Sequence, residues 1–184
     1  MNRGKLFACI GLPRSGKSTY CEDWVMNHNV YDREYNYDKL NRLHTWQIIG
    51  NPRTIVSADN IRMAMNGVRY EPLAETMVFA IKHIMIRAML DRNFDVIVDG
   101  TNSTKISLQR LLEIDPNLTP IFIDTPVDVC KQRAVDTGRP DLIPVIERIS
   151  GNINKIKEVG FQAFIAEIIT EINQRGNYKA VRTV

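Results

Sequence analysis

Eight consecutive residues near the N-terminus have the types and spacing of a phosphate-binding loop. The segment Gly11-Leu12-Pro13-Arg14-Ser15-Gly16-Lys17-Ser18 matches the pattern Gly-x-x-x-x-Gly-Lys-[Ser/Thr]. The glycines let the backbone curl so that successive amides point at phosphate oxygens, and the helix expected after the loop adds the positive end of its dipole. We expect Lys17 to neutralise the β and γ phosphates and the Ser18 hydroxyl to bind Mg²⁺. The residues expected to bind the nucleotide from this loop are Gly11, Ser15, Gly16, Lys17, Ser18 and Thr19.

A carboxylate and a guanidinium follow the second apolar segment, in Ser57-Ala58-Asp59-Asn60-Ile61-Arg62. A spacing of three puts Asp59 and Arg62 on one side of the helix expected there. The carboxyl ends of strands line the ligand crevice of α/β sheets, so this pair is expected to face the transferred phosphate. Asp59 could accept the proton of an attacking hydroxyl, and Arg62 could hold an anionic group of the acceptor. The alternative is a helix cap and a solvated arginine, which the nearby phosphate loop disfavours.

Further polar residues follow the later apolar segments. Asp99 ends the third of them, where a carboxylate can hold a Mg²⁺-bound water or orient an arginine. Asn102 either contacts substrate or caps the next helix, and Arg110 on that helix is more simply interpreted as solvated. Arg133 and Arg139 flank a turn between two expected helices. Arginines in such a lid can neutralise charge in the transition state of phosphoryl transfer, and their alternative is a surface position beside a turn.

The elements that must position these residues alternate between strand and helix. Apolar runs predict strands at 5–10, 54–57, 95–99 and 121–124, with helices at about 16–27, 60–65, 72–89, 104–113, 127–136 and 144–158. Continuous apolar strands are typical of a parallel sheet with helices on both faces, which is an α/β fold. The segment 166–172 fits either a fifth strand or a continuing helix. On the long helix, a stripe predicted to be core comprises Leu73, Met77, Val78, Ile81, Ile84, Met85, Ala88 and Met89.

The segment at about 28–52 is an insertion between the first helix and the second strand. Its aromatic residues Tyr31, Tyr35, Tyr37 and Trp46 are interleaved with Arg33, Lys39 and Arg42, whose charges Asp32, Glu34 and Asp38 offset. These aromatics could stack nucleobases or clamp an RNA end. The simpler interpretation is that they seal an extra helix against the body of the protein.

Composition predicts one soluble domain over residues 1–184. The chain has 24 Lys+Arg against 21 Asp+Glu, a net charge of +3, and 44% hydrophobic residues, which suffice for one core. A charge of +3 is too small to identify a nucleic-acid binder. Three distant cysteines are interpreted as buried thiols rather than a zinc cluster. Neither a membrane span nor a signal peptide is recognised, so we expect a cytoplasmic protein that does not bind membranes.

Other classes of phosphate-loop protein fit less well. A GTPase would carry Asn-Lys-x-Asp, and Asn154-Lys155-Ile156-Lys157 lacks the aspartate. Motor and transport ATPases usually carry paired acids at a strand end, whereas this strand ends Val98-Asp99-Gly100. A small kinase fits better.

Four motifs together resemble the viral polynucleotide 5′-hydroxyl kinases, a branch of the small P-loop kinases. They are GLPRSGKST, SADNIR, VIVDGTN with Arg110, and QRAVDTGRP, and the resemblance covers about residues 5–172. It implies a P-loop kinase fold, a parallel sheet of about five strands with a helical lid at about 126–144, and transfer of the γ-phosphate of ATP to a 5′-hydroxyl end of DNA or RNA with Mg²⁺. It implies these roles: Lys17 and Ser18 as loop residues, Asp59 as general base, Arg62 as acceptor-phosphate contact, and Arg139 and Arg133 as lid arginines. Ile97 stands where a phosphatase motif needs aspartate, so no 3′-phosphatase is expected.

Two other functions stay open. A kinase of a small hydroxyl metabolite, such as a nucleoside, a sugar acid or, in the manner of zeta-type toxins, a nucleotide-sugar, would share the loop, the strand-end aspartate and the lid. A nucleotide-dependent binding module would transfer no phosphate. A basic groove beside Asp59 would favour the polymer, and a closed pocket would favour the metabolite. The choices between DNA and RNA, between ATP and GTP, and between monomer and homo-oligomer are left open.

Overall fold

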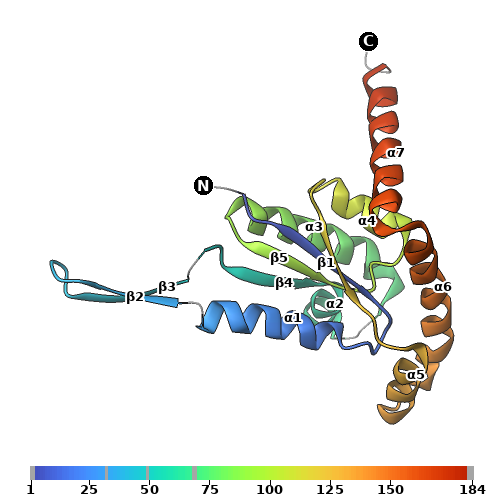
Figure 1. Cartoon of the computed structure of the whole chain (residues 1–184), viewed down its shortest axis with the longest axis horizontal. Helices are drawn as coiled ribbons and strands as arrows, with labels where there is room; N and C mark the ends of the chain where they lie inside the picture. The colour runs from blue at the N-terminus through green and yellow to red at the C-terminus, as the bar shows by residue number, and fades with distance from the viewer. Residues whose placement is uncertain (1–2, 32, 49, 68–69, 182–184) are drawn as a thin grey trace. The chain divides into compact units, whose positions relative to one another are not determined.

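The computed structural model describes residues 3–31, 33–48, 50–67 and 70–181 (Figure 1). The chain forms two compact units that divide within the phosphate loop. The first unit comprises Met1–Ala8 and Lys17–Gly100, and the second comprises Cys9–Gly16 and Thr101–Val184. Strand β1 (Leu6–Gly11) therefore contributes residues to both.

Parallel strands form the core of the first unit. β5 (Asp95–Asp99) pairs with β1 from Leu6 opposite Val96, and β4 (Arg53–Ser57) pairs with β5 from Arg53 opposite Asp95 to Ser57 opposite Asp99. With β6 (Thr119–Ile123), the hydrogen-bonded order is β4-β5-β1-β6. Three of the four predicted strands lie here and are confirmed. Because Ser57 at the end of β4 lies opposite Asp99 at the end of β5, the polar residues at the ends of the two strands are neighbours.

Three helices accompany these strands, and one departs from its predicted face. They are α1 (Lys17–Met26), α2 (Ala58–Asn66) and α3 (Glu75–Asp91), the last preceded by the 3₁₀ turn η2 (Pro72–Ala74). The buried residues of α3 are Val78, Lys82, Ile86 and Leu90, whereas Leu73, Met77, Ile84 and Ala88 of the predicted core stripe are exposed. The prediction was wrong for these four because the true buried face, spaced by four residues, contains a lysine that a hydrophobic pattern does not count.

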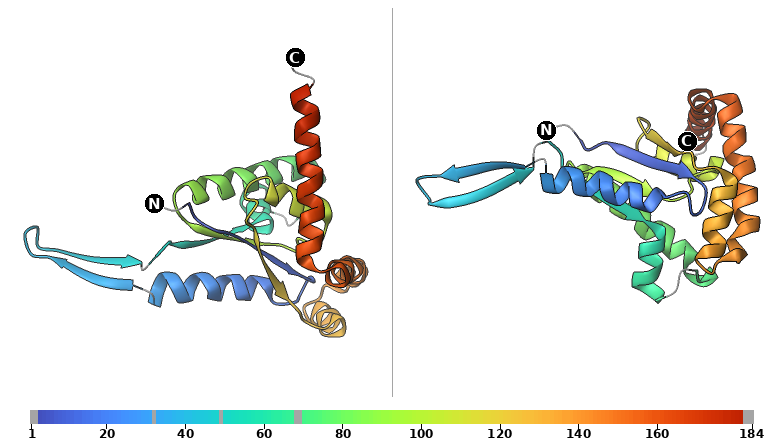
Figure 2. Two further views of the ribbon diagram at one scale, coloured as in Figure 1. Left: turned by 45° about the horizontal axis from the view of Figure 1, so that its top comes forward. Right: turned by 60° about the horizontal axis from the view of Figure 1, so that its bottom comes forward.

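The insertion forms a β-ribbon rather than an extra helix. A π-helical turn, η1 (Asn27–Tyr31), leads into the antiparallel strands β2 (Arg33–Asp38) and β3 (Leu43–Ile48), which form a sheet of their own. Figure 2 shows the ribbon extending beyond the end of α1. Tyr35 and Tyr37 are 48% and 42% exposed, so they do not seal a helix against the body. The side chains of Tyr31 and Trp46 lie outside the described part of the structure.

The second unit is mostly helical. Its helices are α4 (Lys105–Leu112), α5 (Val127–Asp136), α6 (Ile143–Val159) and α7 (Phe161–Val181), with the 3₁₀ turn η3 (Pro140–Leu142) between α5 and α6. The fourth predicted strand is β6. The ambiguous segment 166–172 is helical: Ile165 and Ile168 are buried at helical spacing, and Glu167 and Glu171, one turn apart, both contact Lys105 Nζ at 2.6 Å. The main sheet therefore has four strands among the described residues.

The predicted α/β class and helix-flanked parallel sheet are confirmed. Cys9, Cys21 and Cys130 are buried free thiols, as predicted. None of the described helices combines the length and hydrophobicity needed to cross a bilayer.

Candidate functional site

The phosphate loop has the backbone conformation that its sequence predicts. The Ser15 amide donates to the Leu12 carbonyl at 3.2 Å, which closes a turn, and Arg14 and Gly16 both have positive φ, at 65° and 96°. A side chain at Gly11 would place its Cβ 2.9 Å from the Ile123 carbonyl oxygen. Gly11 is therefore required for close approach to β6, and Gly16 for its left-handed conformation.

Two side chains of the second unit hold the carbonyl groups of the loop. The Thr125 hydroxyl donates to the Ser15 carbonyl at 2.7 Å, and Arg133 Nη1 of α5 donates to the Arg14 carbonyl at 3.2 Å. With these carbonyls bonded, the turn is held in place. Sequence reasoning missed Thr125, although it lies within two residues of the end of a strand, as Asp99 and Asp59 do, and this was an available signal.

Asn102, a predicted substrate contact, is buried, and its side-chain amide donates to the Cys9 carbonyl at 2.8 Å. This hydrogen bond joins the residues after β5 to β1 within the second unit. Arg110 is exposed on α4.

The first unit supplies the residues that follow the loop. Lys17 begins α1 and is buried, whereas Ser18 and Thr19 are exposed in the first turn. The Ser18 hydroxyl donates to Asp99 Oδ2 at 2.8 Å. A hydroxyl and a carboxylate are oxygen ligands of the type that Mg²⁺ prefers, and this ion usually takes its remaining ligands from water and phosphate. The pair therefore fits Mg²⁺, and among the described residues no denser cluster of acidic, histidine or cysteine ligands occurs.

Asp59 and Arg62 lie together at the beginning of α2, as their spacing predicts. Arg62 Nη1 contacts Asp59 Oδ1 at 2.5 Å, and the Asp59 side chain is 73% exposed. Ser57 ends β4 and caps α2 by accepting a hydrogen bond from the Asn60 amide. The cap sets the direction of the first turn, so a carboxylate able to accept a proton stands open to solvent next to a guanidinium.

Glu75 is a third member of this cluster, and sequence reasoning missed it. Arg62 donates Nε to Glu75 Oε1 and Nη2 to Glu75 Oε2, both at 2.7 Å, and the side chains of Arg62 and Glu75 are only 15% and 19% exposed. The hydrogen bonds from Arg62 lower the pKa of Glu75, and those to Glu75 raise the pKa of Arg62. The guanidinium also lies 5.9 Å from the centre of the Phe79 ring, which Lys82 Nζ approaches at 5.8 Å. Arg62 is thus held from three sides.

The segment predicted as a lid is a helix, a turn and a helix: α5, η3 and α6. Arg139 pairs with Asp141, with Nε to Oδ1 at 2.9 Å and Nη2 to Oδ2 at 2.8 Å. This pairing raises the pKa of Arg139 and lowers that of Asp141, to which Arg14 of the loop makes a smaller contribution. The two predicted lid arginines therefore differ: Arg133 bonds the loop, and Arg139 is held within its own segment.

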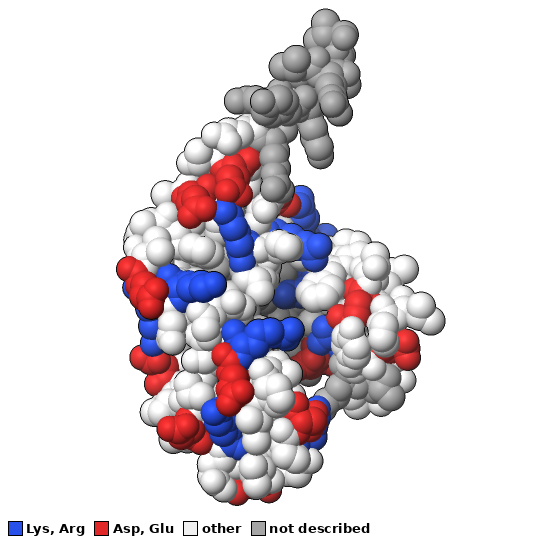
Figure 3. Space-filling view, turned by 90° about the vertical axis from the view of Figure 1, so that its right-hand side faces the viewer, with Lys and Arg blue, Asp and Glu red and all other residues white. Residues whose placement is uncertain are grey.

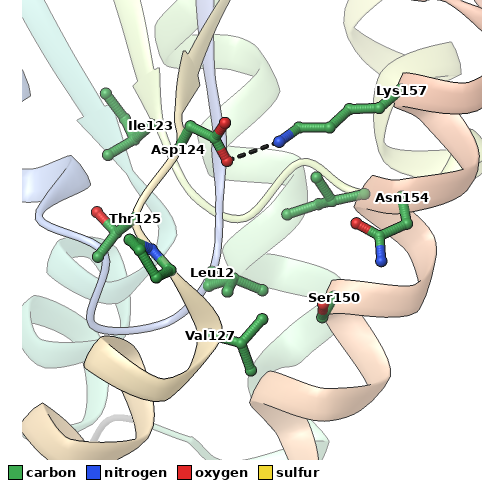
Figure 4. Close-up of a pocket in the computed structure, with 10 residues that line it drawn as sticks. Leu12, Ile123, Asp124, Thr125, Val127, Ser150, Asn154 and Lys157 are labelled. Carbon is green, nitrogen blue, oxygen red and sulfur yellow. Dashed lines mark hydrogen bonds and ion pairs between the residues drawn. The ribbon is translucent and has the colours of Figure 1, made fainter.

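A cavity of about 90 Å³ opens beside the loop in the second unit (Figure 4). Its walls combine apolar side chains with the ion pair between Lys157 Nζ and Asp124 Oδ1, which are 2.6 Å apart. Its lining residues are Leu12, Ile123, Asp124, Thr125, Pro126, Val127, Ser150, Ile153, Asn154 and Lys157. Because Leu12 belongs to the loop, the cavity adjoins the predicted phosphate site.

Figure 3 shows basic side chains next to acidic ones at several places on one face of the molecule. In the second unit Lys131 pairs with Glu147 at 2.7 Å, in addition to the pairs of Lys105, Arg139 and Lys157. The charges of these four basic side chains are therefore compensated locally.

No family model and no curated relative matches the sequence. Among solved structures, the chain is similar to one in the Pnkp1/Rnl/Hen1 RNA repair complex, with a TM-score of 0.63 and 21% identity over 87% of this chain and 47% of that one. A second Pnkp1/Rnl/Hen1 structure has a TM-score of 0.54 and 23% sequence identity, and the match covers 72% of this chain and 40% of that one. The APS kinase CysC of Mycobacterium tuberculosis, in complex with AMPPNP and APS, has a TM-score of 0.50 and 16% sequence identity, and the match covers 73% of this chain and 70% of that one. The chain thus has the P-loop kinase fold and spans about half the length or less of the first two matches.

Proposed function

We propose that the protein is an ATP-dependent kinase that transfers the γ-phosphate to the 5′-hydroxyl end of DNA or RNA. The observation that carries this proposal is the exposed Asp59 carboxylate, held by Arg62 at the carboxyl end of β4, in the same unit as Lys17 and Ser18. A general base must reach both the acceptor hydroxyl and the transferred phosphate. A module that only bound a nucleotide would not need the carboxylate of Asp59 and the guanidinium of Arg62 beside the phosphate loop.

The phosphate-loop residues bind and orient ATP in this proposal. Lys17 neutralises the phosphates, and Ser18 with Asp99 would hold Mg²⁺, which adds charge neutralisation when bound. Arg133 keeps the loop in place, and Arg139 leaves Asp141 to meet the developing charge. Asn102 orients the end of β5 through Cys9.

The acceptor residues move one proton. Asp59 takes the proton of the 5′-hydroxyl as its oxygen forms a bond to the γ-phosphorus, and the bond from that phosphorus to the bridging oxygen breaks to release ADP. Arg62 holds the phosphate that follows the first nucleoside of the acceptor, since a guanidinium binds phosphate in a two-pronged manner. Glu75 keeps the guanidinium in position before the acceptor arrives.

Exposure of Asp59 favours a polymer over a small metabolite. Sites for small molecules usually enclose most of the ligand surface, whereas a chain end needs an opening through which the rest of the chain leaves. The similarity to the RNA repair complex and the four sequence motifs support the same choice. The similarity to APS kinase keeps a metabolite kinase as the second candidate.

The test is transfer of labelled γ-phosphate from ATP, with Mg²⁺, to 5′-hydroxyl DNA and RNA oligonucleotides beside nucleosides and sugar acids. Lys17→Ala should remove transfer, and Asp59→Asn should lower kcat by roughly 100-fold while ATP still binds. Asp23→Asn, a change at an exposed aspartate of α1, is the matched control. Label confined to small molecules would instead establish the metabolite kinase. If ATP bound but no phosphate were transferred to any acceptor, the protein would be a nucleotide-dependent binding module.

A further inference from the structure

The β2–β3 ribbon is a feature that the phosphoryl-transfer site does not use. We propose that it binds single-stranded nucleic acid and contacts the acceptor several nucleotides away from its 5′ end. This inference rests on the proposed function for one point only, which is that a nucleic-acid strand is the acceptor. Binding of that strand by the ribbon does not depend on catalysis.

The base of the ribbon is clamped. Asn29, just before the ribbon, and Arg53, just after it, exchange two hydrogen bonds: Asn29 Nδ2 donates to the Arg53 carbonyl at 2.6 Å, and the Arg53 amide donates to Asn29 Oδ1 at 2.9 Å. His28 Nε2 lies 2.9 Å from the Asn51 carbonyl oxygen. The Arg53 guanidinium lies 4.4 Å from the Trp24 ring centre and donates to the Trp24 carbonyl. An isolated two-stranded ribbon is marginally stable, so this clamp positions it.

The two faces of the ribbon differ in charge. Tyr35 and Tyr37, two residues apart, occupy one face of β2. The two acidic residues Glu34 and Asp38 alternate onto the other face of this strand. Among the described side chains of β2, the acidic ones therefore lie opposite the tyrosines, which suits a polyanion on the tyrosine face.

The spacing of the tyrosines matches stacked bases. Residues two apart on a strand are separated by about 6.7 Å, twice the roughly 3.4 Å between stacked bases. The Tyr35 and Tyr37 side chains are nearly half exposed, and stacking of a base on an exposed aromatic ring does not depend on base identity. Every strand shares this interval, so the choice of a nucleic acid depends on charge: the acidic residues of β2 face away from the tyrosines, and Lys39 and Arg42 are exposed at the tip.

The tip of the ribbon is a preformed turn with two exposed cations. Asp38 accepts hydrogen bonds from the Leu40 amide at 2.9 Å, the Asn41 amide at 3.3 Å and Asn41 Nδ2 at 2.7 Å, and these bonds lower its pKa. Its carboxylate is thus committed to shaping the turn. Lys39 and Arg42 are exposed beside it and can contact backbone phosphates.

The length of α1, which separates the phosphate loop from the ribbon, sets how many nucleotides a strand needs to reach both. The loop residues Lys17 and Ser18 begin α1, and the ribbon follows its other end. A helix of ten residues is about 15 Å long, which a stacked strand crosses in about four to five nucleotides. A dinucleotide bound at Asp59 therefore does not reach the ribbon, whereas a longer strand does.

Fluorescence anisotropy tests the proposal without catalysis. We would titrate protein into 3′-fluorescein DNA and RNA of 2 to 20 nucleotides that already carry a 5′-phosphate, without ATP. Tyr35→Ala/Tyr37→Ala should weaken binding of the 20-mer by about tenfold or more and leave that of the dinucleotide unchanged. Tyr35→Phe/Tyr37→Phe keeps both rings and should stay within about twofold of the wild type. Asn36→Ala, on the opposite face, is the matched control.

Unchanged affinity of the double alanine variant for the 20-mer would overturn the proposal, as would an equal loss in Asn36→Ala or an equal loss at every length. Circular dichroism of both double variants establishes that each is folded. Failure of the proposed function looks different: the wild type would bind the 20-mer through the tyrosines and transfer no phosphate. If the protein transferred phosphate to oligonucleotides but its affinity for the 20-mer did not depend on the tyrosines, only the ribbon proposal would be wrong.

Discussion

At the scale of single residues, Arg62 departs most from what its sequence position suggests. The spacing with Asp59 predicts one ion pair, and the structure adds a two-pronged pair with Glu75 and a ring contact with Phe79. A guanidinium shared between two carboxylates is well oriented but already neutralised. An acceptor phosphate must therefore share Arg62 with Glu75 or displace it.

Glu75→Gln tests whether Glu75 positions Arg62. The amide keeps the shape of the side chain and removes its charge, so Arg62 should lose its fixed orientation. We expect kcat/KM for the acceptor to fall by about tenfold, with KM for ATP unchanged, in steady-state assays at varied oligonucleotide concentration. Glu71→Gln, a change at an exposed glutamate that bonds the Leu73 amide, is the matched control. If Glu75 only competes with the acceptor, KM for the acceptor would fall instead.

The same ion pair makes stability depend on pH in a defined direction. Arg62 lowers the pKa of Glu75 below its ordinary value of 4.5, so the folded state favours the ionised form. The resulting stability is fully present above pH 4.5 and is lost as pH falls through the lowered pKa. The wild type should exceed Glu75→Gln by about 1–2 kcal/mol in free energy of unfolding at pH 7, measured with urea, and by less at pH 3. A difference that grows toward pH 3 would contradict this assignment.

At the scale of elements, the residues after β6 support the phosphate loop. Thr125 bonds the Ser15 carbonyl, and the same short segment joins α5 and α6 in lining the cavity beside Leu12. The cavity has apolar walls with one ion pair, and at about 90 Å³ it can take only part of a nucleoside, such as one edge of the base. This element therefore serves both the phosphate loop and the space next to it.

Val127→Trp should test the cavity. Val127 lines it, so an indole there occupies the space that we assign to the nucleoside. We expect ATP to bind about tenfold more weakly, by calorimetry, while the affinity for an oligonucleotide is retained. Val129→Trp places the same bulk at an exposed position of the same helix and should have no such effect. Equal ATP affinity in the two variants would place the nucleoside elsewhere.

At the scale of the whole molecule, the phosphate loop belongs to both compact units. Gly11 to Gly16 lie in the second unit and Lys17 with Ser18 in the first, although they are consecutive in the chain. A ligand that binds the folded loop and not the unfolded chain stabilises the protein by mass action.

MgATP should therefore raise the unfolding temperature. At a concentration 100 times its Kd, the gain is about 2.7 kcal/mol, or about 5–10 °C for a chain of this size. Differential scanning fluorimetry with ATP or GTP would measure the shift and show which nucleotide binds. Lys17→Ala should show a much smaller shift at the same concentration. An equal shift in this variant would mean that the nucleotide binds away from the loop.

Much of the fold follows from local sequence patterns. Short apolar runs next to glycine or proline define the four strands, and the loop conformation depends on glycines at fixed positions. Patterns of this kind act over a few residues, so they can be recognised without the tertiary structure. The segment 166–172 could not be assigned in this way, because its helical state is stabilised by Lys105, which lies far away in the sequence.

The sequence by itself determined the residue types of the site: the loop from Gly11 to Ser18, and the pair Asp59 and Arg62. Only the tertiary structure decided their partners. Ser18 meets Asp99 because β1 and β5 are neighbours, and Arg62 meets Glu75 because α3 packs beside α2. The ribbon was likewise hidden, since its strands are stabilised by pairing with each other and by a clamp at its base. Contacts between residues distant in the chain depend on packing, which no local pattern records.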